Sequence, residues 1–265
     1  MNYKIDLSFY IFFSIFLSMV FFTKNVFPQN LPECAYISEK SISVSGGLGR
    51  LTIRDKAISN ESYSGSLGYI SIDWKNFREK RGFQIGFEFQ GGSKIKHRNL
   101  SAEVILFSLE LDYLYAIKPF LLFNKNATIY LGPSTGTNFY IRKQNIAFSS
   151  ADDDAISVFS TIPVGIKSKI LFSVSQKILL EVDLYLNILS FGLRFPSNTE
   201  DEVDAKLLHP IDGFKGDVDL TVRYKMFKRL SLSLALKQQA ARISAWDEEL
   251  LYGNSNLVIG LQFSI

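Results

Sequence analysis

The 265-residue chain has few of the residues from which metal and disulfide sites are built. Its one cysteine excludes an internal disulfide and any multi-thiolate metal site. Its two histidines, His97 and His209, argue against a histidine-based metal cage. A net charge of +3 without a basic block argues against nucleic acid as a partner. With 47% apolar residues, the composition is that of a folded chain rather than a disordered one.

Long uncharged apolar runs are also lacking, except at the N-terminus. Residues 7–22 carry no charge, Lys4 precedes them and Lys24 follows them. This is the layout of a secretory signal, and the run is shorter than the roughly 20 residues of a spanning helix. We expect residues 1–29 to be a cleaved signal peptide, with an uncleaved anchor as the alternative. A short periplasmic segment, residues 30–40, would then carry Cys34 as an unpaired thiol.

From residue 41 to residue 265, apolar and polar side chains alternate with a period of two, as in strands with two unlike faces. In one segment, for example, Val182 and Leu184 alternate with Glu181 and Asp183. The pattern predicts about ten strands, within a range of 8–12. We place them at residues 41–53, 63–74, 82–91, 101–115, 127–142, 156–170, 178–194, 215–226, 230–243 and 254–264.

These strands are long and one of their faces is charged. Segments 103–115, 127–142 and 178–194 exceed the 5–6 residues of an ordinary soluble strand and reach the 9–11 that cross a bilayer. Aromatic residues gather toward strand ends, as they do at membrane interfaces, at Trp74, Tyr113, Tyr115, Phe139, Tyr140 and Phe227. We predict an all-β fold over residues 41–265: a closed, antiparallel, up-and-down transmembrane β-barrel.

The expected connections fall into two sets. Tight, basic turns alternate with longer connections, several of them acidic. The turns are Lys75–Arg81, Ala116–Asn126, Phe172–Lys177 and Phe227–Arg229; the longer connections include Lys143–Ala155, Phe195–Phe214 and Ser244–Gly253. This parity is typical of bacterial outer-membrane barrels with both termini in the periplasm. Outer-membrane lipid and, during insertion, the barrel-assembly machinery would then be partners.

Two neighbouring segments carry a family resemblance. The stretch Tyr113–Phe120, followed by Ala127–Gly136 with its Gly-Pro-Ser-Thr-Gly sequence, resembles the PorT-like outer-membrane β-barrel family of the Bacteroidota. The match covers about residues 100–142, and Lys118 interrupts the family's usual Ile-Pro pair. The resemblance implies a signal peptide and an outer-membrane barrel. It transfers no catalytic residue.

The charges on the polar face are expected to point into the lumen. A ten-stranded barrel is narrow enough for side chains to fill it. Mixed charges on facing strands favour a salt-bridged plug over a narrow conducting or substrate-binding path. The predicted lumen charges are Glu88, Glu110, Asp112, Lys167, Lys169, Glu181, Asp183, Asp217, Asp219 and Arg223.

Two acidic connections are weak candidates for surface divalent cations, because Ca²⁺ and Mg²⁺ prefer carboxylate oxygens. Neither has EF-hand spacing, so a solvated loop is the competing interpretation. The residues are Asp152, Asp153, Asp154, Glu200, Asp201, Glu202 and Asp204. The basic segment Lys94–Arg98 is either a solubilising hairpin tip or a group that pairs with these loops or with lipid phosphates.

Catalysis has little support in the sequence. His97 or His209 with a loop aspartate could form a rim site that hydrolyses lipid or peptide, but nucleophilic catalysis needs an oriented serine or cysteine, and no local signature of one is present. We expect a non-enzymatic surface or structural component of the envelope, without a cofactor and with unidentified envelope proteins as possible partners. The alternatives are a narrow channel or transporter for small solutes, and the rim hydrolase.

Overall fold

A computed structural model describes most of the chain after residue 36. The described residues are 37, 39–56, 61–92, 94–97, 100–117, 119–123, 125–144, 155–195, 204–210, 212–245 and 248–265. They belong to one compact unit, Ala35–Ile265. The expected signal peptide and Cys34 lie outside the described residues. Within them, no helix is long and apolar enough to cross a membrane.

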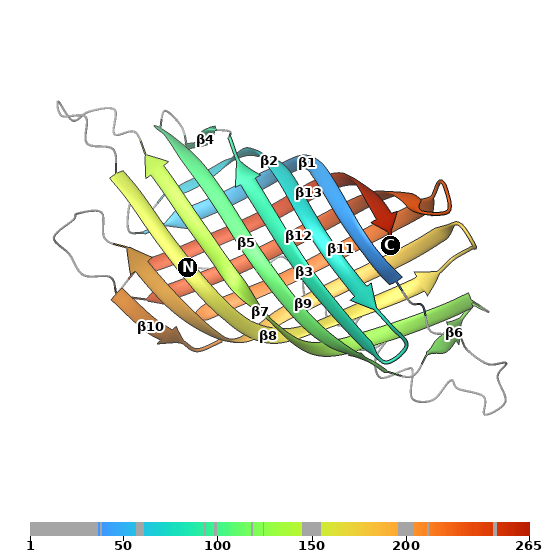
Figure 1. The fold of residues 1–265 in the computed structure, drawn as a ribbon. Coiled ribbons are helices and arrows are strands. Elements are labelled where there is room, and N and C mark those ends of the chain that lie inside the picture. The colour runs from blue at the N-terminus through green and yellow to red at the C-terminus, as the bar shows by residue number, and fades with distance from the viewer. Residues whose placement is uncertain are drawn as a thin grey trace. The chain divides into compact units, whose positions relative to one another are not determined.

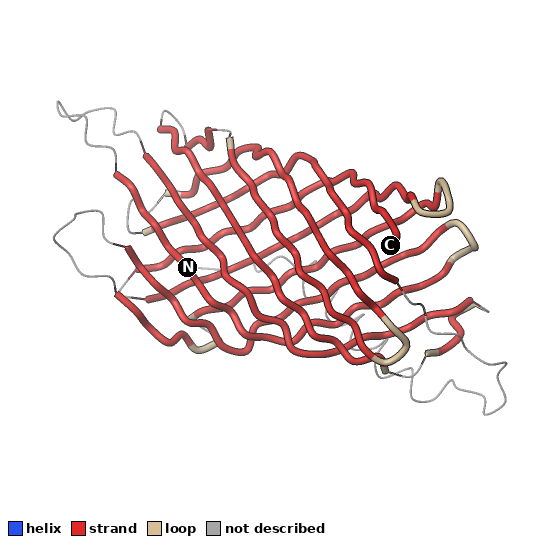
Figure 2. The backbone as a smooth tube through the Cα atoms, viewed as in Figure 1, coloured by secondary structure: helices blue, strands red, loops and turns tan. Residues whose placement is uncertain are grey.

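All the regular structure of the described residues is β-strand, and every pairing is antiparallel (Figures 1 and 2). The strands are β1 Glu39–Asp55, β2 Ser62–Phe77, β3 Arg81–Gly91, β4 Lys94–His97, β5 Leu100–Ala116, β6 Phe120–Leu122, β7 Lys125–Gln144, β8 Ala155–Ser173, β9 Ile178–Phe195, β10 Asp204–Leu208, β11 Gly213–Lys225, β12 Leu230–Ala245 and β13 Glu248–Ser264. Pairing of β1 with β13 closes the sheet. The predicted closed, antiparallel barrel is therefore confirmed.

The wall has ten strands because three of the thirteen described strands, β4, β6 and β10, are short and lie in line with longer ones, and β4 continues β3. Gln90 lies opposite Leu106 and Lys94 lies opposite Glu103. Between these two pairs, β3 and β4 contain one residue more than β5. Such an extra residue is a β-bulge. Gly92 sits in it with a φ of 95°, a conformation that glycine adopts without steric cost. The basic segment Lys94–Arg98 thus contributes four residues to the wall.

Two other short strands also lie in line with longer ones: β6 follows β5, and β10 precedes β11. Between the pairs Ala116–Tyr130 and Phe120–Ala127, the segment that joins β5 to β6 again contains one residue more than the facing part of β7. Residues 209–212 separate β10 from β11, and the His209 carbonyl accepts the amide of Asp212 at 3.0 Å. Part of each predicted connection Ala116–Asn126 and Phe195–Phe214 is therefore strand.

The prediction of a long connection at Ser244–Gly253 is wrong. β12 runs to Ala245 and β13 begins at Glu248, with Ser244 opposite Glu249 in the ladder. The acidic residues that suggested a loop are held on the sheet by neighbouring strands. Glu249 is 2.9 Å from Arg54 of β1 and 3.1 Å from Arg242 of β12.

The two ends of the barrel differ, and we name them by their connections. The turn end holds the start of β1, the end of β13 and the turns 78–80, 174–177 and 226–229. The loop end holds the opposite strand ends, among them the end of β1, the start of β2, the start of β8 and the end of β9. In Figure 1 the turn end lies at the right, where the C-terminus is marked.

The outer wall carries an apolar band, which on β1 ends below the loop end. In β1, Ile42, Val44 and Leu48 point outward and are 40–72% exposed, whereas Leu51 and Ile53 point inward and are fully buried. The apolar residues thus change sides within one regular strand. Beyond Leu48, β1 is apolar inside and polar outside, as in a water-soluble barrel, whereas Ile105 on β5 and Ile156 on β8 keep the outer wall apolar toward the loop end. The band that a bilayer would cover is therefore shorter on β1 than on β5 and β8.

Two apolar clusters fill the lumen near its ends. The turn-end cluster is Phe77, Leu114, Tyr130 and Leu171. The loop-end cluster is Leu51, Ile53, Tyr63, Leu67, Ile95, Ala102, Val104, Leu106, Tyr140, Phe159, Leu208, Ile243 and Leu250. Tyr140 belongs to this cluster and is 4% exposed, so its assignment to an outer aromatic girdle is wrong. The lumen is layered, with charges between two apolar zones.

Candidate functional site

The charged layer of the lumen is the candidate site, and Glu181 on β9 is the centre of its first cluster. One carboxylate oxygen of Glu181 lies 2.7 Å from the Lys75 ammonium on β2. Lys169 on β8 and Arg223 on β11 also pair with this carboxylate. Glu181 is 1% exposed. Three cations from three different strands therefore converge on one buried acid.

This first cluster extends toward the neighbouring strands. Lys169 makes a second ion pair with Asp183, at 2.8 Å. Arg223 makes a second one with Glu39 of β1, at 2.7 Å. Charge-assisted hydrogen bonds of this kind are stronger than neutral ones, and buried charges need them to offset the loss of hydration. The pairs Lys75–Glu181 and Arg223–Glu39 thus tie together strands that are not neighbours in the sheet.

A second cluster surrounds Lys167 on β8. Its ammonium lies 2.8 Å from both Glu110 and Asp112, two carboxylates on the same face of β5. Lys167 is 4% exposed and Asp112 is 1% exposed. The strand β7 lies between β5 and β8, so these pairs cross a strand that contributes the Ser134 hydroxyl, 3.5 Å from Glu110.

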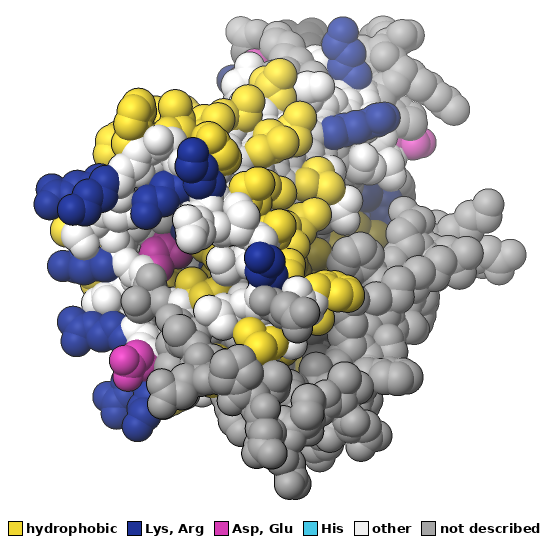
Figure 3. Space-filling view, turned by 90° about the vertical axis from the view of Figure 1, so that its right-hand side faces the viewer, with side chains coloured by type: hydrophobic (Ala, Val, Ile, Leu, Met, Phe, Trp, Pro, Cys, Tyr) yellow, Lys and Arg dark blue, Asp and Glu magenta, His cyan; other side chains and the backbone are white. Residues whose placement is uncertain are grey.

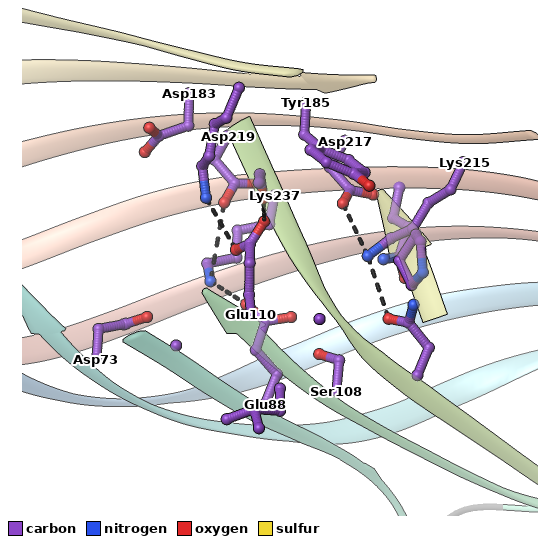
Figure 4. Close-up of a pocket in the computed structure, with 18 of the residues that line it drawn as sticks. Asp73, Glu88, Ser108, Glu110, Asp183, Tyr185, Lys215, Asp217, Asp219 and Lys237 are labelled. Carbon is purple, nitrogen blue, oxygen red and sulfur yellow. Dashed lines mark hydrogen bonds and ion pairs between the residues drawn. The ribbon is translucent and has the colours of Figure 1, made fainter. Parts of the chain in front are cut away.

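A third cluster occupies the middle of the barrel, and Figure 4 shows its side chains converging from several strands. Lys237 on β12 pairs with Glu88 on β3, and its ammonium lies 2.6 Å from the Tyr69 hydroxyl of β2 and 3.8 Å from Asp219. Lys215 beside it lies 3.1 Å from Asp217 and donates to Asn138, also at 3.1 Å.

The space left between these side chains is small. A polar cavity among Glu88, Glu110, Lys237 and Asp217 has a volume of about 50 Å³ open to the centres of water molecules. At roughly 10–15 Å³ per water, such a cavity holds a few waters. A second polar cavity, of about 40 Å³, lies beside Glu181. Ordered water fits these sites.

The structure places all ten predicted lumen charges on the inner face and brings them together in the three clusters. Sequence reasoning did not single out further members of the clusters: Glu39, Asp73, Lys75, Lys215 and Lys237. Their position in the alternation could have identified most of them. Lys75, for example, shares a face with Asp73 but was assigned to a turn because basic residues follow it.

The structure describes only some of the other candidate residues. The loop acids 152–154 and 200–202 lie outside the described residues, and of Asp204 and His97 only the backbone, in β10 and β4, is described. His209 is exposed at the loop end. In the described part of the chain, no group of three or more His, Cys, Asp or Glu side chains could hold a metal ion.

Comparison with known proteins identifies the fold. No family model and no curated protein matches the sequence. The outer membrane protease OmpT from Escherichia coli aligns with a TM-score of 0.51 at 8% identity, over 90% of this chain and 100% of that one. The translocator domain of the autotransporter NalP from Neisseria meningitidis aligns with a TM-score of 0.45 at 9% identity, over 97% and 98%. The likeness to OmpT is one of fold, that of an outer-membrane β-barrel.

Proposed function

We propose that the chain is a non-enzymatic component of the bacterial outer membrane, a barrel with a side-chain-filled lumen whose loop end projects from the bilayer. The observation that carries the proposal is the ion pair between Lys75 and Glu181. It joins β2 to β9, and four wall strands lie between these two on either side of the barrel. Side chains therefore meet across the full width of the lumen.

The layering of the lumen supports closure. A solute on its way through would have to separate buried ion pairs in the middle and pass an apolar cluster at each end. Removing one partner from a buried pair costs several kcal/mol, because the other charge is left uncompensated. Both features oppose steady conduction.

The loop end supports a role at the surface. Beyond Leu48, the outward residues Arg50, Thr52 and Arg54 are polar while the interior remains apolar. On this side of the barrel the loop end of the wall suits contact with water, which supports its projection from the bilayer. The acids of the lumen are engaged by cations, which favours a structural role for them over acid–base chemistry. Membership of the PorT-like family stays a prediction.

The decisive experiment is single-channel recording of the full chain refolded into planar bilayers. Heat-modifiable gel mobility would first show that the protein is folded. We expect no steady conductance, and a steady unitary current in the wild type would overturn the closed lumen in favour of the narrow channel. The double variant Glu88→Ala with Lys237→Ala removes both partners of a central pair. It should stay closed, because the apolar clusters remain.

A further inference from the structure

The turn end presents a dense set of cations on the outside of the barrel. We define the basic crown as the exposed Lys and Arg side chains of this end: Lys40, Arg78, Lys80, Arg81, Lys125, Lys177, Lys225, Lys228 and Arg229. Among the described residues that are exposed at this end, Glu79 is the single acidic one. Figure 3 looks at this end and shows Lys and Arg side chains gathered along its rim with few acidic ones.

Large apolar side chains share this level of the barrel. Phe123 is 85% exposed, Phe227 is 66% exposed and Tyr115 is 51% exposed. Tyr115 lies directly opposite Arg81 in the ladder of β3 and β5. Aromatic rings beside basic groups are characteristic of the headgroup level of a membrane, where the ring stays apolar and the cation meets phosphate.

The crown cannot lie far from the membrane, because its turns are tight. The amide of Arg78 donates to the Arg81 carbonyl at 2.8 Å, and the amide of Met226 donates to the Leu230 carbonyl at 3.0 Å. On β1, Lys40 stands two residues from Ile42, the first residue of the apolar band. At about 3.3–3.4 Å per residue this is roughly 7 Å. The crown charges thus lie within about one Debye length of the headgroups, where salt screens them little.

We propose that the basic crown is a binding surface for anionic phospholipid headgroups in the leaflet that the turn end meets. The proposal rests on the proposed function in one respect, since the apolar band must lie in a bilayer. Several phosphates can be contacted at once around the rim, by charge-assisted hydrogen bonds from ammonium and guanidinium groups. The crown then selects anionic lipid for the annulus around the turn end and fixes the depth of the barrel.

Trp74 offers a local reporter of this annulus. It is one of two tryptophans in the chain, it lies on β2 near the turn end, and its ring packs edge-on against Phe83 at 5.6 Å. In a Trp246→Phe background, quenching by brominated phosphatidylglycerol and by brominated phosphatidylcholine can be compared in otherwise equal vesicles. We expect the wild-type crown to prefer the anionic lipid roughly fivefold, the scale of one well-placed cation at an anionic surface.

The variant Arg78→Gln, Lys80→Gln, Lys228→Gln, Arg229→Gln should lose this preference, and high salt should weaken it in the wild type. The matched control neutralises cations of the loop end, with Arg50→Gln, Lys56→Gln and Lys96→Gln, and should leave quenching of Trp74 unchanged. An equal preference in the crown variant and the wild type would overturn the proposal. Crown-dependent sedimentation with purified cell-wall sacculi, without lipid preference, would overturn it in favour of an acidic polymer. No quenching by either lipid would instead contradict the membrane location itself.

Discussion

Lys75 and Glu181 meet across the whole width of the barrel, with 2.7 Å between the ammonium nitrogen and a carboxylate oxygen. The two residues are far apart in sequence and lie on opposite walls, so their contact reports the closure of the sheet as well as the filling of its lumen. The asymmetry between the partners is informative. Glu181 also forms ion pairs with Lys169 and Arg223. Lys75, in contrast, contacts the opposite wall through its ion pair with Glu181.

This asymmetry predicts unequal effects of the two neutralisations. Glu181→Gln should destabilise the barrel by about 3–5 kcal/mol, because it leaves three buried cations without their common acid. Lys75→Met should cost less, since Glu181 keeps two cations. Urea titration of refolded protein, read by heat-modifiable gel mobility, measures both. Equal losses would show that the contact across the lumen, rather than the convergence on Glu181, sets the stability.

A second prediction concerns the two faces of β9. Leu184 points outward in the apolar band, and Leu184→Arg should cost roughly 2–4 kcal/mol, the cost of a cation near the bilayer midplane. Asp183→Asn removes a lumen charge whose partner is Lys169, so it should still insert and should lose less stability. Refolding into vesicles with urea titration compares them. If Leu184→Arg refolds like the wild type while Asp183→Asn fails to insert, the inner and outer faces have been exchanged.

The faces of β9 could be predicted because the alternation is clean from Glu181 to Asn187, where every second residue is charged or polar. The apolar ends of the lumen could not be predicted in this way. Val104 and Leu106 face inward while Ile105 faces outward, so the sequence shows a continuous apolar run and the two faces look alike. In β1 the sequence does show the change of face, because the apolar residues move from even to odd positions between Leu48 and Leu51. This change can be interpreted only when the position of the bilayer boundary on the strand is known.

The ends of the strands were the other feature that could not be predicted well from the sequence. Gly92 begins a bulge, and a glycine in an alternating segment suggests the end of a strand rather than its continuation as β4. Glu248 and Glu249 looked like part of a loop, yet β13 begins with them because Arg54, Lys56 and Arg242 surround Glu249. The contacts of Glu249 with Arg54 and Lys56 join parts of the chain that are far apart in sequence, and no short window of the sequence contains them.

A third prediction tests the bulge between β3 and β4. At Gly92 a Cβ would meet no atom within 4 Å, but the φ of 95° is strained for any other residue. Gly92→Ala should therefore destabilise the barrel by about 1–3 kcal/mol. Gly253→Ala is the matched control, because a Cβ there also has open space and no positive φ is required. Urea titration of the two variants should separate conformational strain from bulk, and a neutral Gly92→Ala would refute the strained bulge.

The last prediction concerns orientation. If the turn end is periplasmic, a group at the loop end is reachable from outside the cell and one on a turn is not. His209 is exposed at the loop end and Lys228 is exposed on the turn after β11, which makes them suitable positions for single cysteines in a Cys34→Ser background. On intact cells, a membrane-impermeant maleimide should label His209→Cys. It should label Lys228→Cys only after the outer membrane is permeabilised, because the turn lies behind the bilayer. Labelling of Lys228→Cys alone on intact cells would invert the topology, and the crown would then meet the outer leaflet. Equal labelling of both would show that the barrel does not separate the two compartments.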